Sequence, residues 1–153
     1  MALLDSLPEP MRGYLATLPC PTFETTPFVD APPAGERRGA MISTAGLHRR
    51  GDRPFTLGSD DYRVIPGDVK ANDLVMSHVS TNFDRTGFQQ DLNVIFPIDR
   101  LREMAGRGEI GSVADFHYAF MGATEPEKME HVVRKLASLL KEDGVNAVLL
   151  VPV

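Results

Sequence analysis

The segment Ser77–Arg100 carries a dense group of side chains that can bind a ligand or transfer a proton. An apolar run, Leu92–Phe96, and a Pro-initiated helix follow directly. In α/β proteins, the loop between a strand and the next regular element commonly presents the functional site. We therefore expect one wall of a polar cleft here, built from His78, Asp84, Arg85, Gln89, Gln90 and Asp91.

Three histidines, His48, His78 and His117, lie near the ends of predicted strands or in the loops after them. If these strands are parallel neighbours, the imidazoles converge on one crevice. With Asp84 or Asp91 they would form a three-histidine, one-carboxylate set suited to Zn²⁺ or Fe²⁺. The spacing contains no compact H-x-x-H or H-E-x-x-H pattern. Hydrogen bonds from the histidines to carboxylates or to the backbone are the alternative.

Two Asp-Arg pairs, Asp52-Arg53 and Asp84-Arg85, are the predicted carboxylate-binding groups. An arginine that a carboxylate holds in place can bind a substrate carboxylate in a bidentate manner, which suits an amino-acid-like ligand. The alternative is that both pairs attach loops to the fold.

The polar residues that follow in the chain also have two interpretations. Gln89, Gln90 and Asp91 could hydrogen-bond to the ligand, or they could cap a strand over Leu92–Phe96. The sequence contains one cysteine, Cys20, which excludes an internal disulfide and a site with several thiolates. No cationic residue lies beside Cys20 in the sequence, so we expect an inert thiol.

The composition is that of one ordinary globular domain. The 153 residues are 42% hydrophobic and 24% charged, and the net charge is −5. We therefore expect neither a nucleic-acid partner nor a membrane partner. The N-terminus lacks the pattern of a signal peptide, and no window is apolar enough to span a bilayer, so a cytoplasmic location is predicted.

The predicted organisation is an N-terminal part, residues 1–36, followed by an α/β domain, residues 37–153. A short helix over Pro10–Leu18 precedes a Pro-rich extended arm, because closely spaced prolines exclude helix there. Three apolar residues of the arm, Phe23, Phe28 and Val29, predict that it lies against the body of the protein. Disorder of the arm, which its composition would also allow, is the alternative.

The α/β domain is predicted from alternating strand and helix patterns. The best-defined helix is Glu125–Lys141, with a Thr124/Glu127 capping box and an apolar stripe. A second helix begins at Pro97 and ends near Gly106. Strands are expected over Arg38–Ala45, Tyr62–Ile65, Asp73–Val79, Leu92–Phe96, Val113–Met121 and Asn146–Val153. The fold class is α/β, with a mostly parallel open sheet, flanking helices and Rossmann-like or flavodoxin-like layering.

The last predicted strand, Asn146–Val153, is a continuous apolar run, as expected of a central strand buried on both faces. Ligands of open parallel sheets bind beyond the carboxyl ends of the strands. The position after Val153 is therefore one where chemistry usually occurs. We expect a partner chain or a second copy of this chain to complete the site there. The alternative is that Val153 is a well-buried terminus.

Four segments carry a family resemblance that extends from about Arg38 to the last residue. They read ISTAGLHRRGDRPF, YRVIPGD, FDRTGFQQDLNVIFPIDRLREMAGRGEIGSVADFHYAFMGA and GVNAVLLVPV. In these segments the chain resembles the glycine/sarcosine/betaine reductase selenoprotein B family and the related D-proline reductase proteins.

The resemblance implies reductive cleavage of a C–N bond in a small amino acid or its N-methylated derivative. In the full reductases of the family, a selenocysteine or cysteine performs the redox chemistry. A partner subunit with a carbonyl group, usually a pyruvoyl, captures amino substrates. This sequence has no selenocysteine, and Cys20 does not correspond to the redox position. The resemblance therefore transfers the scaffold and part of the ligand pocket, but not the activity.

The favoured hypothesis is an oxidoreductase, or a subunit of one, that acts on a small amino-acid-like substrate with a partner supplying the redox thiol. The predicted catalytic residues are His48, His78, Asp84 and His117. The predicted substrate-binding residues are Arg53, Arg85, Gln89, Gln90 and Asp91. A non-redox binding or accessory subunit is the alternative, and a metal-dependent lyase or hydrolase is a third. No cofactor is evident, apart from the possible zinc or iron.

Overall fold

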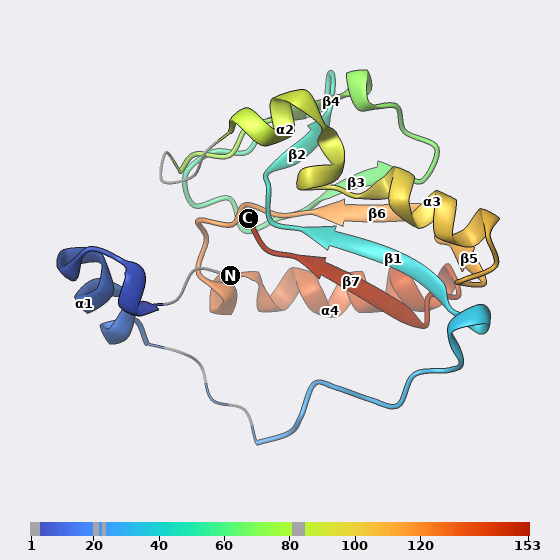
Figure 1. Cartoon of the computed structure of the whole chain (residues 1–153), viewed down its shortest axis with the longest axis horizontal. Helices are drawn as coiled ribbons and strands as arrows, with labels where there is room; N and C mark the ends of the chain where they lie inside the picture. Colours follow the sequence, from blue (N-terminus) through green and yellow to red (C-terminus); the bar gives the residue numbers. More distant parts are fainter. Residues whose placement is uncertain (1–3, 20–21, 23, 81–84) are drawn as a thin grey trace. The chain divides into compact units, whose positions relative to one another are not determined.

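The computed structural model describes residues 4–19, 22, 24–80 and 85–153 (Figure 1). The chain divides into two units, residues 1–30 and 31–153. The first unit contains η1 (Leu4–Ser6) and α1 (Glu9–Thr17), so the predicted N-terminal helix is confirmed. Phe28 and Val29 are 86% and 87% exposed, so neither packs within this unit. Their packing against the other unit stays a prediction, and Phe23 and Cys20 lie outside the described residues.

The second unit is built on a mostly parallel sheet, which confirms the predicted α/β class. Its central strand β1 (Arg38–Ser43) pairs in parallel with β5 (Ser112–Val113), β6 (Phe116–Ala119) and β7 (Ala147–Val151). The outer strand β3 (Arg63–Pro66) is antiparallel to β6. A separate antiparallel pair consists of β2 (Leu47–Arg49) and β4 (Leu74–Met76). The arrows of β1, β6 and β7 in Figure 1 point toward the same edge of the sheet.

Helices connect these strands and cover the sheet. The α-helices are α2 (Thr86–Gln90), α3 (Ile98–Gly106) and α4 (Pro126–Glu142). Short 3₁₀ turns are η2 (Ala34–Glu36), η3 (Ala71–Asp73) and η4 (Leu92–Val94). Within the described chain, no helix is both long enough and apolar enough to cross a membrane.

The two faces of the sheet have separate hydrophobic cores because successive side chains of a strand point to opposite faces. On β1, Met41 belongs to the core that contains Phe96, Ile98 and Leu101. Its neighbour Ile42 belongs to the core beneath α4, which is centred on Tyr118, Phe120 and Leu136. Five residues of the predicted apolar stripe of α4 pack in this core, whereas the sixth, Val133, is 45% exposed.

Two local predictions around helices are wrong. The run Leu92–Phe96 begins with the 3₁₀ turn η4 rather than a strand. The turn forms because the Asp91 carboxylate accepts a hydrogen bond from the backbone N–H of Asn93 at 2.9 Å and caps it. The Thr124/Glu127 capping box is also absent, since the Thr124 hydroxyl donates to the carbonyl oxygen of Ser59 at 2.7 Å.

Two strand predictions also differ from the structure. The predicted strand Val113–Met121 is interrupted, and its halves are β5 and β6. The predicted central strand is β7, which pairs with β1 on one side and with no other described strand. Its middle residues are exposed, so it is an edge strand in the described chain rather than one buried on both faces.

Candidate functional site

The carboxyl ends of β1, β6 and β7 are tied together by backbone hydrogen bonds. The N–H of Thr44, after β1, donates to the carbonyl oxygen of Val151 at 3.1 Å. The N–H of Gly122, after β6, donates to the carbonyl oxygen of Thr44 at 2.9 Å. The N–H of Val153 donates to the Thr44 hydroxyl at 2.8 Å. These segments form the carboxyl edge, where open α/β sheets usually bind ligands.

His78 reaches the carboxyl edge from the loop after β4. The N–H of Ser77 donates to the carbonyl oxygen of Gly46 at 3.0 Å, which attaches this loop to the end of β1. A Cβ atom on Gly46 would lie 3.0 Å from the His78 backbone, and Gly46 has a φ of 65°. Glycine therefore satisfies both the turn and the close approach at this position. His78 itself is only 6% exposed.

Gly122 allows the His78 imidazole to approach the backbone of the carboxyl edge. A Cβ atom on Gly122 would lie 2.8 Å from the carbonyl oxygens of both Thr44 and Val153, and 3.0 Å from Nε2 of His78. The imidazole nitrogen and the two carbonyl oxygens are therefore packed directly against Gly122, which leaves no room for a methyl group there. Gly46 and Gly122 are not among the predicted site residues, although a glycine soon after a predicted strand is a usable signal.

The protonation state of His78 follows from its contacts. The N–H of Ser80 donates to Nδ1 at 3.1 Å, so the neutral ring carries its proton on Nε2. Burial lowers the pKa of His78 below its ordinary value, and the positive charge of Arg85 lowers it further. His78 is therefore a neutral hydrogen-bond donor at neutral pH, with its Nε2–H at the carboxyl edge.

Arg85 holds the loop that carries His78. One of its terminal nitrogens, Nη2, donates to the carbonyl oxygens of His78 at 2.9 Å and of Ser80 at 2.6 Å. The predicted catalytic residue Asp84 lies outside the described residues, and so does its predicted pairing with Arg85. Arg85 is half-buried and next to the candidate site, so its predicted position near the ligand is compatible with the geometry.

His117 lies inside the sheet rather than at its edge. It is fully buried on β6, and its Nδ1 accepts a hydrogen bond from the N–H of Met41 at 3.0 Å. Its ring meets the Phe96 ring edge to face, with centroids 5.7 Å apart. Nε2 has no hydrogen-bond partner among the described residues. Burial is the main cause that lowers the pKa of His117 to about 4.

His48 has a third environment. It lies on β2, opposite Val75 of β4, and is 4% exposed. Its Nδ1 is 2.9 Å from the carbonyl oxygen of Arg49, so Nδ1 is the donor. In the part of the chain that the structure describes, no three His, Cys, Asp or Glu side chains are grouped as a metal site requires. The predicted convergence of three histidines is thus not found there.

The remaining predicted ligand-binding residues have surface positions or structural partners. Arg53 forms an ion pair with Asp61 rather than with Asp52, and its side chain is 76% exposed. Asp91 accepts hydrogen bonds from both the backbone and the side chain of Asn93, which also lower its pKa. Gln89 and Gln90 are exposed at the end of α2.

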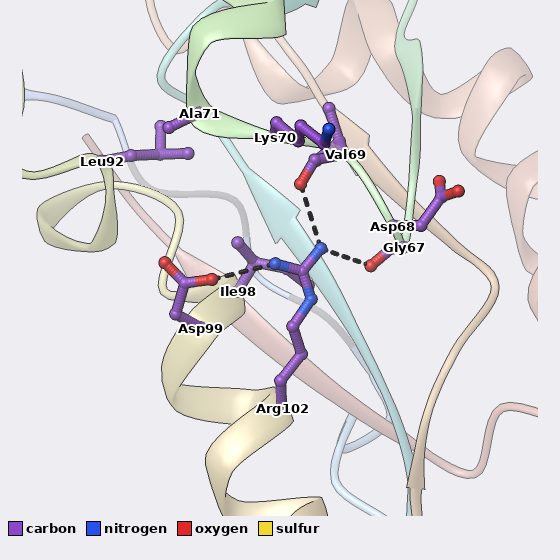
Figure 2. A pocket seen from close by; sticks show the side chains of 9 residues that line it. All are labelled: Gly67, Asp68, Val69, Lys70, Ala71, Leu92, Ile98, Asp99 and Arg102. Carbon is purple, nitrogen blue, oxygen red and sulfur yellow. Dashed lines mark hydrogen bonds and ion pairs between the residues drawn. The ribbon is translucent and has the colours of Figure 1, made fainter.

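A separate hollow of about 520 Å³ lies beside the start of α3 (Figure 2). Arg102 crosses it and donates to the carbonyl oxygens of Gly67 at 2.7 Å and Val69 at 3.0 Å, and to Asp99 at 2.9 Å. The guanidinium group is therefore engaged with the fold. None of the predicted site residues lines this hollow.

Comparison with known families gives one match, which covers residues 64–153. The family is the glycine/sarcosine/betaine reductase selenoprotein B family. The chain belongs to this family. The match includes the loop with His78, β6 with His117 and the apolar strand β7.

Several curated proteins are similar to the chain. The D-proline reductase subunit gamma of Acetoanaerobium sticklandii is 40% identical over 114 residues, which are 72% of this chain and 46% of that protein. The glycine reductase complex component B subunit gamma of Carboxydothermus hydrogenoformans is 26% identical over 96% of this chain and 36% of that protein. The same figures apply to the sarcosine reductase complex component B subunit beta of Peptoclostridium acidaminophilum.

The chain thus spans less than half the length of each of these relatives. Their names identify them as reductase subunits or as components of reductase complexes. No solved structure matches the chain significantly.

Proposed function

We propose that the chain is a subunit of a reductase that binds a small amino-acid-like substrate at the carboxyl edge beside His78. Family membership supports the reductase class. Relatives named for glycine, sarcosine and D-proline support a substrate of that size and chemistry. The predicted substrate site is the one that open α/β sheets commonly use.

The observation that carries the proposal is the set of polar atoms around Gly122. Nε2 of His78 and the carbonyl oxygens of Thr44 and Val153 gather there, so closely that a Cβ atom on Gly122 would contact all three. A hydrogen-bond donor suits the carboxylate of an amino acid, and carbonyl oxygens suit its amino group. Arg85, and Asp84 beside it in the sequence, complete the proposed site. Gln89 and Gln90 are proposed to form its outer wall.

The proposed chemistry is reductive cleavage of a C–N bond by two thiols. The C–N bond breaks, the carbon and the nitrogen each gain one hydrogen, and the two thiols lose these hydrogens and form a disulfide. The sequence contains the single cysteine Cys20, which cannot form a dithiol by itself. We therefore propose that a thiol-bearing partner polypeptide supplies the electrons, while this chain binds and orients the substrate through His78.

Calorimetric titration of the purified protein with glycine, sarcosine, betaine and D-proline tests the proposal. We expect one of them to bind, and His78→Ala to weaken binding about tenfold or more, because a buried charge-assisted hydrogen bond is lost. His78→Gln retains an N–H donor and should lose less. The matched control is His131→Gln, since His131 is exposed on α4.

Equal affinities of the wild-type protein and a folded His78→Ala variant would remove His78 from the site. A second measurement tests turnover. It follows the oxidation of a dithiol reductant together with the formation of the amine product. Binding without such turnover, in the presence of a thiol-bearing subunit, would favour a non-redox accessory subunit instead.

A further inference from the structure

Strand β7 has the composition of an interior strand but the position of an edge strand. Its residues Ala147–Val151 pair in register with Gly39–Ser43 of β1. Val148 and Leu150 therefore share a sheet face with Ile42, and Leu149 shares the opposite face with Met41. Val148 and Leu149 are each 43% exposed, and Leu150 is 67% exposed. Both faces of the strand thus present apolar side chains to solvent.

The two edges of the sheet differ in how they are protected. The opposite edge strand, β3, contains the charged Arg63 and ends at Pro66, which lacks an N–H. Charge and proline are devices that prevent another strand from pairing with an edge. The five residues of β7 contain neither a charge nor a proline. The β7 edge, defined here as the unpaired side of Ala147–Val151, is therefore open to a further strand.

Helix α4 also has one large exposed apolar side chain, Val133, on the side away from β3. His131 lies 4.0 Å from Asp60, so its side of the helix turns toward the loop before β3. Val133 lies two residues later, which places it about 200° around an α-helix and on the side away from β3. Its side chain is 45% exposed. An additional strand beside β7 would bury apolar side chains of the strand and approach this side of α4.

We propose that the β7 edge binds a strand of the thiol-bearing partner polypeptide, in parallel orientation. The inference rests on the proposed function, which requires such a partner. The relatives contain more than twice the length of chain that matches here, so the family includes further polypeptide that is available to supply the added strand. The parallel orientation follows from β7, because an apolar run on both faces is typical of strands with parallel neighbours.

The orientation links the interface to the site. The carboxyl end of a parallel added strand lies at the same edge of the sheet as His78 and Gly122. Residues that follow this strand in the partner would therefore reach the substrate site. Strand addition of this kind obtains its affinity from main-chain hydrogen bonds and its specificity from side-chain pockets.

The test uses labelled peptides of about 15 residues, long enough to include one strand. They cover the part of the Acetoanaerobium sticklandii D-proline reductase subunit gamma outside the 114 matched residues. Fluorescence anisotropy measures their binding to the full chain. We expect one peptide to bind, and Leu150→Lys to weaken it about tenfold or more, because a charge would enter an apolar interface. Hydrogen exchange should show new protection of the β7 amides.

The matched control is Val64→Lys on β3, since Val64 is 40% exposed on the opposite edge strand. It should leave peptide affinity unchanged. The proposal is overturned if no peptide binds, or if Val64→Lys and Leu150→Lys weaken binding equally. It is also overturned if light scattering shows a dimer of this chain that Leu150→Lys dissociates, because a second copy then covers the edge. Titration with small amino acids is independent of these results, so failure of the docking site and failure of the proposed function are distinguishable.

Discussion

Two buried histidines, one in a loop and one on a strand, have different surroundings. His78 lies at the carboxyl edge, and its Nε2 is beside carbonyl oxygens of the strand ends. His117 lies inside the sheet, and its Nδ1 accepts the N–H of Met41 from the neighbouring strand. The first geometry can bind a ligand, whereas the second replaces a missing carbonyl acceptor in the sheet. Residue type alone does not separate these roles, and the position along the strand does.

The burial of His117 predicts a pH dependence of stability. Its folded-state pKa of about 4 lies below its ordinary value of 6.5, chiefly because of burial and then the charge of Arg102. The unfolded chain therefore binds a proton that the folded chain excludes. The contribution of neutral His117 to the free energy of unfolding is fully present above pH 6.5. It decreases as the pH falls toward 4, by about 3 kcal/mol in total.

Urea unfolding of wild type and His117→Gln at pH 7 and pH 4 measures this contribution. Glutamine retains an acceptor for Met41 but does not titrate. We expect the variant to be less stable at pH 7 and to lose less stability on acidification. The other titrating groups are common to both proteins, so the same loss in both would contradict the prediction.

The break between β5 and β6 changes the register of this segment relative to β1. Arg38 pairs with Ser112 and Ile42 pairs with Tyr118, so four steps along β1 correspond to six along the partner. The extra residues form a bulge, which is uncommon between parallel strands. Asp143 stabilises it from the end of α4. Its Oδ2 accepts the N–H groups of Asp115 at 2.9 Å and Phe116 at 3.2 Å.

Asp143 should therefore be a major stabilising residue. Its carboxylate also pairs with Arg38. Burial raises the pKa of Asp143, but the hydrogen bonds from Arg38 and the two N–H groups outweigh it and leave the pKa lowered. Asp143→Ala would leave the N–H groups of Asp115 and Phe116 without this acceptor and remove one carboxylate partner of Arg38, at a cost of about 2 to 4 kcal/mol. Chemical denaturation at neutral pH measures the loss.

The control is Asp115→Ala. Its side chain is 75% exposed, although it also pairs with Arg38 at 3.0 Å. An exposed ion pair contributes about 0 to 1 kcal/mol, so this variant should be nearly as stable as wild type. Equal destabilisation by the two substitutions would show that the bulge does not depend on Asp143.

At the scale of the whole molecule, the candidate site is assembled from segments that are far apart in the sequence. Patterns of apolar residues predicted the α/β class, α4 and the strands β1, β3, β4 and β7, because periodicity is a local property. The break after Val113 was not predictable, because it depends on Asp143 and on a histidine acceptor. The exposure of β7 was not predictable either, since an apolar run does not specify its neighbours.

The predicted site residues differ in where the structure places them, and their roles stay predictions. His78 and Arg85 lie at the carboxyl edge, as their place after a strand indicated. His48 and His117 were grouped with them because each is near a strand end in the sequence. The structure separates them, since β2 pairs with β4 in a second sheet and His117 points into the core. Convergence of side chains depends on strand order, which a single sequence does not reveal.

Three segments that are far apart in the sequence pack against Gly122, because this residue has no side chain. Gly122→Ala would place a Cβ atom 2.8 Å from two carbonyl oxygens and 3.0 Å from His78, so backbone or imidazole must move. We expect a loss of about 1 to 3 kcal/mol in stability, as for overpacked sites. Weaker binding of the small amino acid should accompany it.

Gly106→Ala is the matched control, since nothing lies within 4 Å of a Cβ atom there and the residue ends α3. Alanine should be neutral or stabilising at that position by up to about 1 kcal/mol. Urea unfolding and the imidazole NMR signals of His78 measure both variants. If Gly122→Ala leaves the stability and the His78 signals unchanged, the strand ends are not packed against the imidazole. The proposed substrate site would then have to exclude His78.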